Sequence, residues 1–301
     1  MSCVVRITLA GVYMSLSRSL LFVPATNARA VEKCTTLDCD GIILDLEDSV
    51  AADAKEAARQ KVADILQSGH AVFRNSLIRV NSVDSGEILN DIKVIGKYFP
   101  AAIVIPKVQS AQDVMQVERA LENMAEAKNT KLWVMIETAR GVMNLADICG
   151  SSPRLEGIIL GPNDLLKDLG GRMTPRQDAL ITSYGLAIIA ARAYGLKCID
   201  GVYKYFKDSE GLTRNCQQGR DLGFDGKSLI HPAQIAITNV QYGPNADDIT
   251  HAKALIAAFE AAQARGEGLA VLDGEMIENL HVEQARAMLR VASQISDKDD
   301  T

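Results

Sequence analysis

Residues 41–50 read Gly41-Ile42-Ile43-Leu44-Asp45-Leu46-Glu47-Asp48-Ser49-Val50, an apolar run that ends in three carboxylates within four residues. Such a run is typical of a buried strand. An ionised carboxylate is costly to bury unless it is paired, hydrogen-bonded or bound to a metal, so the cluster suggests a polar site above a sheet or barrel. A solvated strand end that leads into a helix N-terminus would suit Asp48, Ser49 and Asp53 as well. Taken alone, the run leaves both interpretations open.

Apolar, β-branched runs recur at fairly regular intervals along the rest of the chain. Segments rich in Ala, Glu, Lys and Gln with helical spacing separate them, for example residues 52–67, 111–127 and 175–194. Repeated strand–helix units whose strands are apolar on both faces predict an α/β protein with a parallel (β/α)8 barrel, the TIM barrel. The predicted strands cover residues 19–24, 41–46, 77–81, 102–106, 132–137, 157–161, 197–202 and 225–230.

Polar residues gather at the C-terminal ends of these predicted strands, where a TIM barrel carries its active site. The opposite ends offer mostly small or apolar residues. Because the strand ends meet at one mouth, their convergence is the main argument from residues alone for an enzyme. The residues concerned are Glu47, Asp48, Arg79, Asn81, Lys107, Glu137, Asn163, Asp164 and Asp200.

Length and composition agree with a single enzyme-sized barrel. The chain has 301 residues, which suits one barrel of about 250 residues with an extension. Hydrophobic residues make up 48% of it, enough for a large core, and the net charge of −6 argues against a general nucleic-acid binder. No run reaches the ~20 apolar residues that cross a membrane. We therefore expect neither a nucleic acid nor a membrane as a partner.

The cysteines and histidines show no metal or nucleophile motif. The six cysteines lack paired zinc spacing, and the four histidines are too dispersed for an obvious zinc site. A Ser-His-Asp triad has no nucleophile elbow to support it. We interpret the cysteines as reduced thiols of a cytoplasmic protein.

The chain divides into three predicted parts. Residues 1–17 lack the long apolar core and cleavage site of a targeting peptide, so we interpret them as a disordered or misassigned N-terminal extension. Residues 18–240 form the predicted barrel. Residues 241–301 are predicted to form C-terminal helices and a lid, after a linker that contains Gly243 and Pro244.

Short motifs accompany most of the predicted strands. They are Arg18-Ser19-Leu20-Leu21-Phe22-Val23-Pro24, Leu44-Asp45-Leu46-Glu47-Asp48-Ser49-Val50, Ile78-Arg79-Val80-Asn81, Ile105-Pro106-Lys107-Val108, Ile136-Glu137-Thr138, Gly161-Pro162-Asn163-Asp164-Leu165, Ile199-Asp200-Gly201-Val202-Tyr203 and Gly226-Lys227-Ser228-Leu229-Ile230-His231-Pro232. Each is weak alone. Taken in order they resemble the citrate lyase beta subunit and its relatives in the HpcH/HpaI aldolase superfamily, the malyl-CoA and citramalyl-CoA lyases, across roughly residues 18–294.

The resemblance implies a Mg²⁺-dependent lyase. Such an enzyme cleaves a 3-hydroxy-3-carboxyacyl thioester (citramalyl-CoA, malyl-CoA or a citryl thioester) to acetyl-CoA or an acetyl carrier and a 2-oxo acid, or runs the reverse condensation. Retro-aldol cleavage requires a site that holds the hydroxy-acid end and stabilises negative charge on the thioester oxygen. Mg²⁺ suits the first task because it takes oxygen ligands and is bound by one or two carboxylates.

The resemblance also implies roles for individual residues. Glu137 and Asp164 match the family's metal ligands, and Arg79 matches the arginine that contacts the substrate and the developing enolate. Glu47 and Asp48 are expected to orient Arg79 and metal-bound water. The alternative from the residues alone is that Glu137 is a salt-bridged strand end and that Arg79 is an ion-pair partner of Glu47 or Asp48.

Four further residues are candidates for substrate or CoA binding. Arg29 and Lys33 lie four residues apart on one predicted helix face and match basic residues that contact the cofactor in related citramalyl-CoA lyases. Phe22 replaces a tyrosine found in some of those lyases. Lys107 fits the family motif as a substrate-binding residue, although a lysine after a strand is often a solvated loop residue.

The C-terminal lid departs from the family pattern. The family commonly ends in Gly-Lys-Met-Ile-Asp, whose aspartate reaches a neighbouring subunit's site as acid or base, whereas this chain reads Gly274-Glu275-Met276-Ile277-Glu278. The carboxylate survives with one more methylene, which weakens the expectation of an additional thioesterase step. A lid that acts in trans implies a homo-oligomer, a trimer by analogy with the family.

Two other functions remain open. The chain is alternatively a metal-dependent aldolase of free 2-oxo acids, which would need neither Arg29, Lys33 nor the lid. It is alternatively a silent family member, an interpretation that the substitution at Glu278 keeps open. No motif distinguishes one hydroxyacyl thioester from another, because a methyl group in an apolar pocket is worth only about 1–3 kcal/mol.

Overall fold

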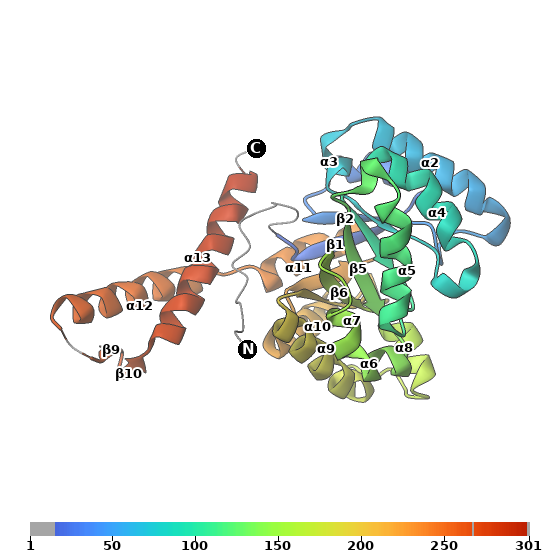
Figure 1. Ribbon diagram of the computed structural model, residues 1–301. Coiled ribbons are helices and arrows are strands. Elements are labelled where there is room, and N and C mark those ends of the chain that lie inside the picture. Colours follow the sequence, from blue (N-terminus) through green and yellow to red (C-terminus); the bar gives the residue numbers. More distant parts are fainter. Residues whose placement is uncertain (1–15, 267, 300–301) are drawn as a thin grey trace.

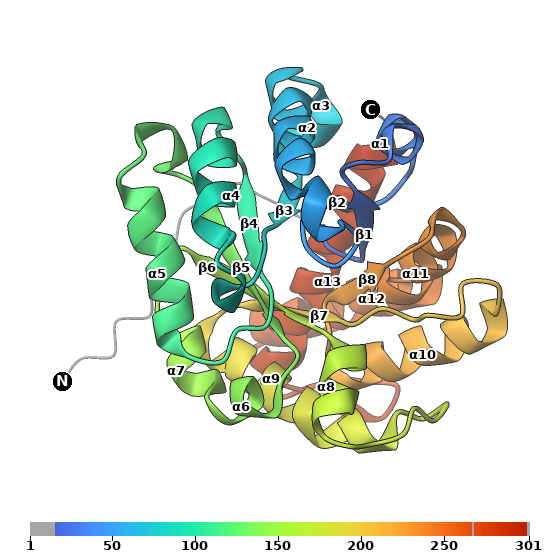
Figure 2. The same cartoon turned by 90° about the vertical axis from the view of Figure 1, so that its right-hand side faces the viewer.

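The computed structural model describes residues 16–266 and 268–299. Eight parallel strands pair in chain order, and β8 pairs with β1, so the sheet closes as the sequence predicts (Figure 2). The predicted TIM barrel is therefore confirmed. Its strands are β1 (Ser19–Pro24), β2 (Gly41–Asp45), β3 (Leu77–Arg79), β4 (Ala102–Ile105), β5 (Lys131–Ile136), β6 (Leu155–Leu160), β7 (Lys197–Asp200) and β8 (Gly226–Leu229).

Helices surround the barrel, and a second group of elements follows it. The helices around the barrel are α1 (Ala28–Cys34), α2 (Lys55–Gln67), α3 (Ala71–Arg74), α4 (Ile88–Ile95), α5 (Ala111–Glu122), α6 (Ala139–Met143), α7 (Leu145–Cys149), α8 (Pro162–Asp168), α9 (Ile181–Tyr194), α10 (Ser209–Leu222) and α11 (Ile235–Tyr242). Short 3₁₀ turns lie at Ala52–Ala54, Val83–Ser85, Gly96–Tyr98, Ala125–Ala127, Asp178–Leu180 and Pro232–Gln234. None of the helices within the described residues is both long and apolar enough to span a lipid bilayer.

The barrel interior is a packed apolar core. Alternate residues of each strand point inward, so Leu20, Ile43 and Leu77 share this core with Trp133, whereas their chain neighbours face the helices. The Trp133 ring fits because Gly157 stands opposite it on β6, where any Cβ would collide with the ring. The packed interior leaves the C-terminal strand ends, the mouth, as the place for a site.

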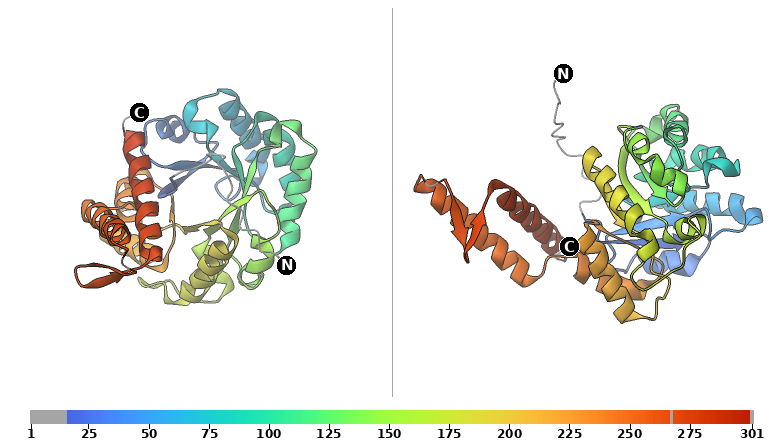
Figure 3. Two further views of the ribbon diagram at one scale, coloured as in Figure 1. Left: turned by 60° about the vertical axis from the view of Figure 1, so that its left-hand side comes forward. Right: turned by 90° about the horizontal axis from the view of Figure 1, so that it is seen from below.

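The C-terminal residues form an arm that projects from the barrel (Figures 1 and 3). It consists of α12 (Ala246–Ala264), the antiparallel hairpin of β9 (Ala270–Leu272) and β10 (Glu275–Ile277), and α13 (Asn279–Asp299). The hairpin packs on the two helices through a small core of its own, made of Ala262, Ala270, Ile277 and Val282. The predicted C-terminal extension is therefore present.

The root of the arm lies at the N-terminal ends of the strands, opposite the mouth. Near the end of α13, Lys298 pairs with Asp38 at 2.7 Å and with Asp40 at 3.0 Å, just before β2 begins. Asp40 also binds the guanidinium of Arg18, which precedes β1. The hairpin lies at the far end of the arm from this root.

The expected N-terminal extension lies largely outside the described residues, which begin at residue 16. Leu16 and Ser17 are buried, and the Ser17 hydroxyl accepts a hydrogen bond of 3.1 Å from Lys197 Nζ at the start of β7.

Candidate active site

The register of β2 and β3 sets Asp45 directly beside Arg79 at the mouth. The guanidinium donates two parallel hydrogen bonds to the carboxylate, Nε to Oδ1 and Nη2 to Oδ2, each 2.7 Å long. Asp45 also accepts the backbone N–H groups of Glu47 and Ser49. Burial alone would raise the pKa of Asp45, but the hydrogen bonds and charge of Arg79 outweigh it and lower that pKa. The pair fixes Arg79 in one orientation.

Sequence reasoning missed Asp45 and expected Glu47 or Asp48 to pair with Arg79. Both are in fact nearby, because Arg79 Nη1 lies 3.1 Å from Glu47 Oε2 and 3.5 Å from Asp48 Oδ2. The Glu47 contact is an ion pair without hydrogen-bond geometry, since Oε2 has no hydrogen-bond partner within the described residues. Burial therefore raises the pKa of Glu47 despite the charges of Arg79 and Lys107.

Lys107 is tied to the same carboxylates. Its Nζ lies 2.6 Å from Glu47 Oε1 and 3.3 Å from Asp48 Oδ1, so the ammonium points at this cluster and does not line the mouth cavity. The backbone of Lys107 has a left-handed φ of 53°, a conformation that residues other than Gly rarely adopt. That conformation directs the Lys107 N–H to Glu137 Oε1, 2.7 Å away.

Glu137 follows β5 and is 2% exposed. Burial raises its pKa to about 7, and the negative charge of Glu47 adds to the shift. Gly161 stands against the carboxyl group, where any Cβ would collide with Oε2. Glu137 Oε1 accepts the Lys107 N–H, and no described residue donates a hydrogen bond to Oε2. A buried carboxylate with one free oxygen suits a cation ligand.

A cavity of about 370 Å³ opens at the mouth. Of the residues singled out from the sequence, Phe22, Asp48, Arg79, Glu137, Asn163 and Asp164 line it, and Glu47 and Lys107 do not. Asp164 belongs to the first turn of α8, directly after β6. Residues that sequence reasoning gave no role also line the cavity, namely Pro24, Asp45, Ser49, Met135, Leu160, Pro162, Val202, Ser228 and Ile230.

Phe22 contacts Arg79. The guanidinium carbon lies 4.8 Å from the centre of the Phe22 ring, a cation–π distance, and both side chains line the cavity. Burial would lower the pKa of Arg79, but Asp45, Glu47 and Asp48 raise it overall. Arg79 therefore presents a permanent positive charge to the cavity.

Besides Glu47 and Lys107, three predicted site residues lie outside the cavity. Arg29 and Lys33 are exposed on α1, which follows β1 on the mouth side of the barrel. Glu278 lies on the arm between β10 and α13, and no arm residue lines the mouth cavity of its own chain. The structure thus brings Glu137, Asp164, Arg79 and Phe22 together in one cavity and leaves Arg29, Lys33 and the predicted acid or base Glu278 apart from it.

Two residues expected at the mouth face elsewhere. Asn81 bonds the Asp91 carboxylate of α4 through its backbone and side-chain N–H groups, 2.7 Å each. Asp200 points outward between β7 and the helices, where it pairs with Lys227 at 2.5 Å. Both are fully paired and buried, so their role is structural.

A family model described as HpcH/HpaI aldolase/citrate lyase matches residues 18–232. The (3S)-malyl-CoA thioesterase of Cereibacter sphaeroides is 44% identical over 93% of this chain and 95% of its own length. The citrate lyase subunit beta of Escherichia coli K12 is 33% identical over 90% of this chain and 92% of its own length.

A solved structure has the same fold. The protein CitE of Mycobacterium tuberculosis, crystallised in complex with magnesium, acetoacetate and coenzyme A, matches with a TM-score of 0.75 and 26% identity, over 93% of this chain and 99% of that chain. The matched family region contains the cavity-lining carboxylates Glu137 and Asp164, together with Arg79. The chain therefore belongs to the HpcH/HpaI aldolase/citrate lyase family.

Proposed function

We propose that this protein is a Mg²⁺-dependent carbon–carbon lyase that acts on a 3-hydroxy-3-carboxyacyl thioester of CoA or of an acyl carrier. It releases an acetyl thioester and a 2-oxo acid, or joins them in reverse. The observation that carries the proposal is that one cavity brings the carboxylates of Glu137 and Asp164 together with a permanently charged Arg79. Family membership and the magnesium, acetoacetate and coenzyme A bound to the CitE protein support it.

The donor set fits Mg²⁺. This ion is bound by one or two carboxylates and completes its shell with water and substrate oxygens. Within the described residues no cluster of three His, Cys, Asp or Glu side chains forms a full protein cage. Glu137 Oε2 has no hydrogen-bond donor, and burial beside Glu47 raises the pKa of Glu137, a cost that a cation would remove. Glu137 and Asp164 would hold the ion, which polarises the substrate's hydroxyl and carboxylate oxygens when bound.

Arg79 would stabilise the charge that develops during cleavage. The 3-hydroxyl loses its proton, the bond between C2 and C3 breaks, and its electron pair moves onto the thioester as an enolate. C2 then takes up a proton to become the acetyl methyl group. Arg79 is pre-oriented by Asp45 and by the Phe22 ring, so its donors need no reorganisation when the enolate oxygen becomes negative.

The remaining residues take supporting roles. Glu47 and Asp48 hold Arg79 and Lys107 at the mouth, so Lys107 acts on the substrate through these carboxylates. Arg29 and Lys33 are exposed cations on α1, the helix that follows β1, and would contact the phosphates of CoA. The five described cysteines are free thiols, which supports a cytoplasmic enzyme.

Glu278 would supply the acid or base from a neighbouring subunit. The arm leaves the barrel at the face opposite the mouth, which carries Glu278 away from the cavity of its own chain. A homotrimer in which each arm serves the next barrel would complete every site. Glu278 is exposed, so its carboxylate is available to a neighbour.

Hydrolysis of the thioester is a second candidate. The 44% identity to a (3S)-malyl-CoA thioesterase favours it, although the extra methylene of Glu278 argues against a precisely placed water. An aldolase of free 2-oxo acids has less support, because no histidine lines the mouth cavity within the described residues.

The test is incubation of the protein with Mg²⁺ and either malyl-CoA or citramalyl-CoA, followed by mass spectrometry of all products. A lyase yields acetyl-CoA with glyoxylate or pyruvate, whereas a thioesterase yields free CoA with the intact hydroxy diacid. EDTA should stop turnover. Glu137→Gln and Asp164→Asn should weaken Mn²⁺ binding measured by calorimetry, and Glu122→Gln on the exposed face of α5 is the matched control. Unchanged Mn²⁺ binding in both site variants would reject the ligand assignment.

A further inference from the structure

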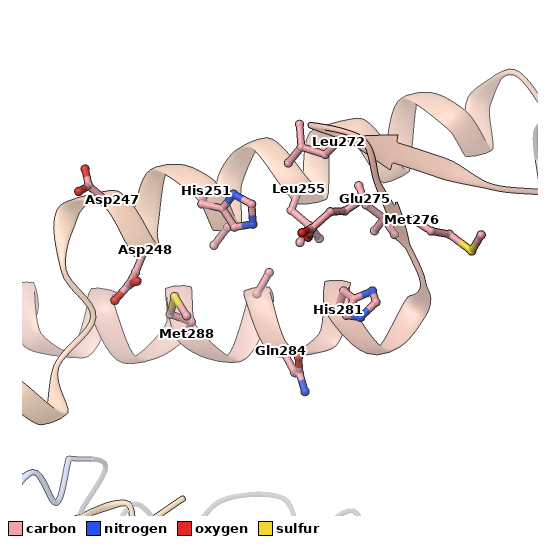
Figure 4. Close-up of a pocket in the computed structure, with 13 residues that line it drawn as sticks. Asp247, Asp248, His251, Leu255, Leu272, Glu275, Met276, His281, Gln284 and Met288 are labelled. Carbon is pink, nitrogen blue, oxygen red and sulfur yellow. The ribbon is translucent and has the colours of Figure 1, made fainter. Parts of the chain in front are cut away.

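A cavity of about 300 Å³, here called the side cavity, lies next to the mouth cavity. Asn163 and Val202 line both of them. The larger groove on the arm, about 460 Å³ between α12, the hairpin and α13, shares no described lining residue with the mouth cavity (Figure 4). Of these two spaces, the side cavity is therefore the one that adjoins the candidate active site.

Besides Asn163 of α8, three segments line the side cavity. They are the connection between α8 and α9, the loop between β7 and α10, and the first two turns of α10. Met173, Pro175 and the rings of Tyr203 and Tyr205 give the cavity apolar and aromatic surface. Apolar walls with a few polar groups are the usual form of a small-molecule subsite.

Two buried amides belong to the polar part of this lining. Asn215 is 3% exposed and Gln177 is 6% exposed. Asn215 Nδ2 donates to Gln177 Oε1 at 3.0 Å, whereas Asn215 Oδ1 accepts no hydrogen bond from another described residue. Gln177 also has a left-handed φ of 52°. An unpaired buried amide oxygen beside a strained backbone is typical of a site that binds a polar group.

The amide pair can present N–H groups as well as an oxygen. An amide exchanges the positions of its oxygen and nitrogen by half a turn about its last bond. If both amides turn, Gln177 Nε2 donates to Asn215 Oδ1, and Asn215 Nδ2 takes the place of the unpaired oxygen. The pair then offers a free N–H donor to an acceptor such as a carboxylate.

The charges in the lining favour an anion. With the residues that the structure describes, Lys204 forms no ion pair, and Arg214 pairs with Glu210 at 3.7 Å, where both side chains are largely exposed. Asp208 also lines the cavity, but its carboxylate already accepts the Tyr203 hydroxyl and a backbone N–H. Two cations are thus available to a ligand where the acidic group is already bonded.

The proposed reaction leaves one substituent of its substrate without a partner. The carbon that carries the hydroxyl also carries a carboxylate, the thioester arm and a fourth group. Glu137 and Asp164 are assigned to the ion that takes the hydroxyl and carboxylate oxygens, and Arg79 to the thioester. Asn163 stands next to Asp164 in the first turn of α8 and lines the side cavity as well. The wall beside the assigned ligand is therefore also a wall of the side cavity.

We propose that the side cavity receives this fourth group, and that the group is an extended chain with a terminal carboxylate. The inference rests on the proposed function. The chain passes Asn163 and Val202 and then meets Lys204, Arg214 and the Asn215 amide. These three residues line the side cavity and not the mouth, so the carboxylate must be carried past the shared wall. The matching 2-oxo acid is a diacid with at least two methylenes between its carbonyl and its far carboxylate.

Calorimetric titration of 2-oxo acids into the Mn²⁺-loaded protein tests the proposal without turnover. 2-Oxoglutarate should bind about tenfold more tightly than 2-oxovalerate, in which a methyl group replaces the far carboxylate. Lys204→Gln/Arg214→Gln should abolish this preference and leave the binding of glyoxylate, which has no chain, unchanged. Arg172→Gln/Arg176→Gln is the matched control, because both cations are exposed on the α8–α9 connection and neither lines the side cavity. It should keep the preference.

Asn215→Leu tests the buried amide separately. Leucine has a similar size but offers only apolar atoms, so the preference should reverse in favour of 2-oxovalerate. Circular dichroism and thermal melting check that every variant is folded.

The outcomes separate this inference from the proposed function. A wild-type protein that binds glyoxylate, but binds 2-oxoglutarate no more tightly than 2-oxovalerate, overturns the inference and leaves the function intact. A folded Lys204→Gln/Arg214→Gln variant that keeps the wild-type preference also overturns it. If the Mn²⁺-loaded protein binds none of the three acids, the proposed function fails and the inference fails with it.

Discussion

Lys107 contacts the candidate active site through both its backbone and its side chain. The N–H bonds Glu137 and the ammonium bonds Glu47, but only the N–H requires the left-handed backbone. Lys107→Gly keeps that backbone and loses the ammonium. Lys107→Val cannot adopt it without strain. Strain of about 1–2 kcal/mol corresponds to roughly tenfold in a binding constant.

We therefore expect Lys107→Val to weaken Mn²⁺ binding by about tenfold and Lys107→Gly to retain near-wild-type binding. Calorimetric titration of the metal measures both. Equal losses in the two variants would show that the ammonium, and not the backbone N–H, holds the site together.

Arg79 offers a second test at the scale of one residue. Lysine keeps the charge of Arg79 but cannot make the two parallel hydrogen bonds to Asp45. Its single ammonium would leave the enolate oxygen without an oriented donor. We expect Arg79→Lys to lower kcat by about 100- to 1000-fold, the usual effect of losing one such donor. Steady-state kinetics measures it, and a change confined to KM would assign Arg79 to binding alone.

Between the barrel strands and the helices, one ion pair joins two elements of the wall. Lys227 on β8 and Asp200 on β7 are both fully buried, and the Tyr242 hydroxyl of α11 lies 3.4 Å from Asp200 Oδ2. Removing one partner leaves a buried charge alone, at a cost of about 3–5 kcal/mol. Urea unfolding of Lys227→Met should show this loss, and Lys227→Met/Asp200→Leu should recover part of it. A single variant as stable as wild type would mean that water reaches the pair.

The ion pairs of Asp40 with Arg18 and Lys298, which anchor the arm to the barrel, predict that stability depends on pH. Burial would raise the pKa of Asp40, but Arg18 and Lys298 lower it below its ordinary value of 3.8. Because the folded pKa is the lower one, the anchor adds stability above that value and loses it as pH falls. Lys298→Met should cost about 1 kcal/mol at neutral pH, and the difference from wild type should shrink below pH 4. Urea titrations at several pH values measure it, and a constant difference would exclude Asp40 as the partner.

The barrel strands show how much of the fold and of the candidate site the sequence could predict. The strands were visible because both faces of a parallel barrel strand are apolar, and the confirmed barrel follows from them. For that reason the pattern does not say which way a polar residue inside a strand points. Asp200 turns outward beside inward-facing Ile199, whereas Asp45 turns inward on the same face as Ile43. The ambiguity extends just beyond the strands, because Glu137 after β5 lines the cavity whereas Asn81 after β3 turns to Asp91 of α4.

For the whole molecule, each complete site is proposed to combine the barrel of one subunit with the arm of another. A chain with Glu137→Gln then retains a working arm, and a chain with Glu278→Gln retains a working barrel. In a ring assembled at random from equal amounts, about one quarter of the sites would join the two intact parts. Co-refolding the two inactive variants should therefore restore about a quarter of wild-type activity.

The matched control for this mixing is Glu137→Gln with Asp164→Asn. Both substitutions lie in the barrel, so no exchange of arms can produce an intact site and the mixture should remain inactive. Light scattering must show the same mass for both mixtures, so that only the position of the defect differs. Recovery in the control as well would point to reassortment within the barrel, whereas no recovery in either mixture would mean that Glu278 does not act across subunits.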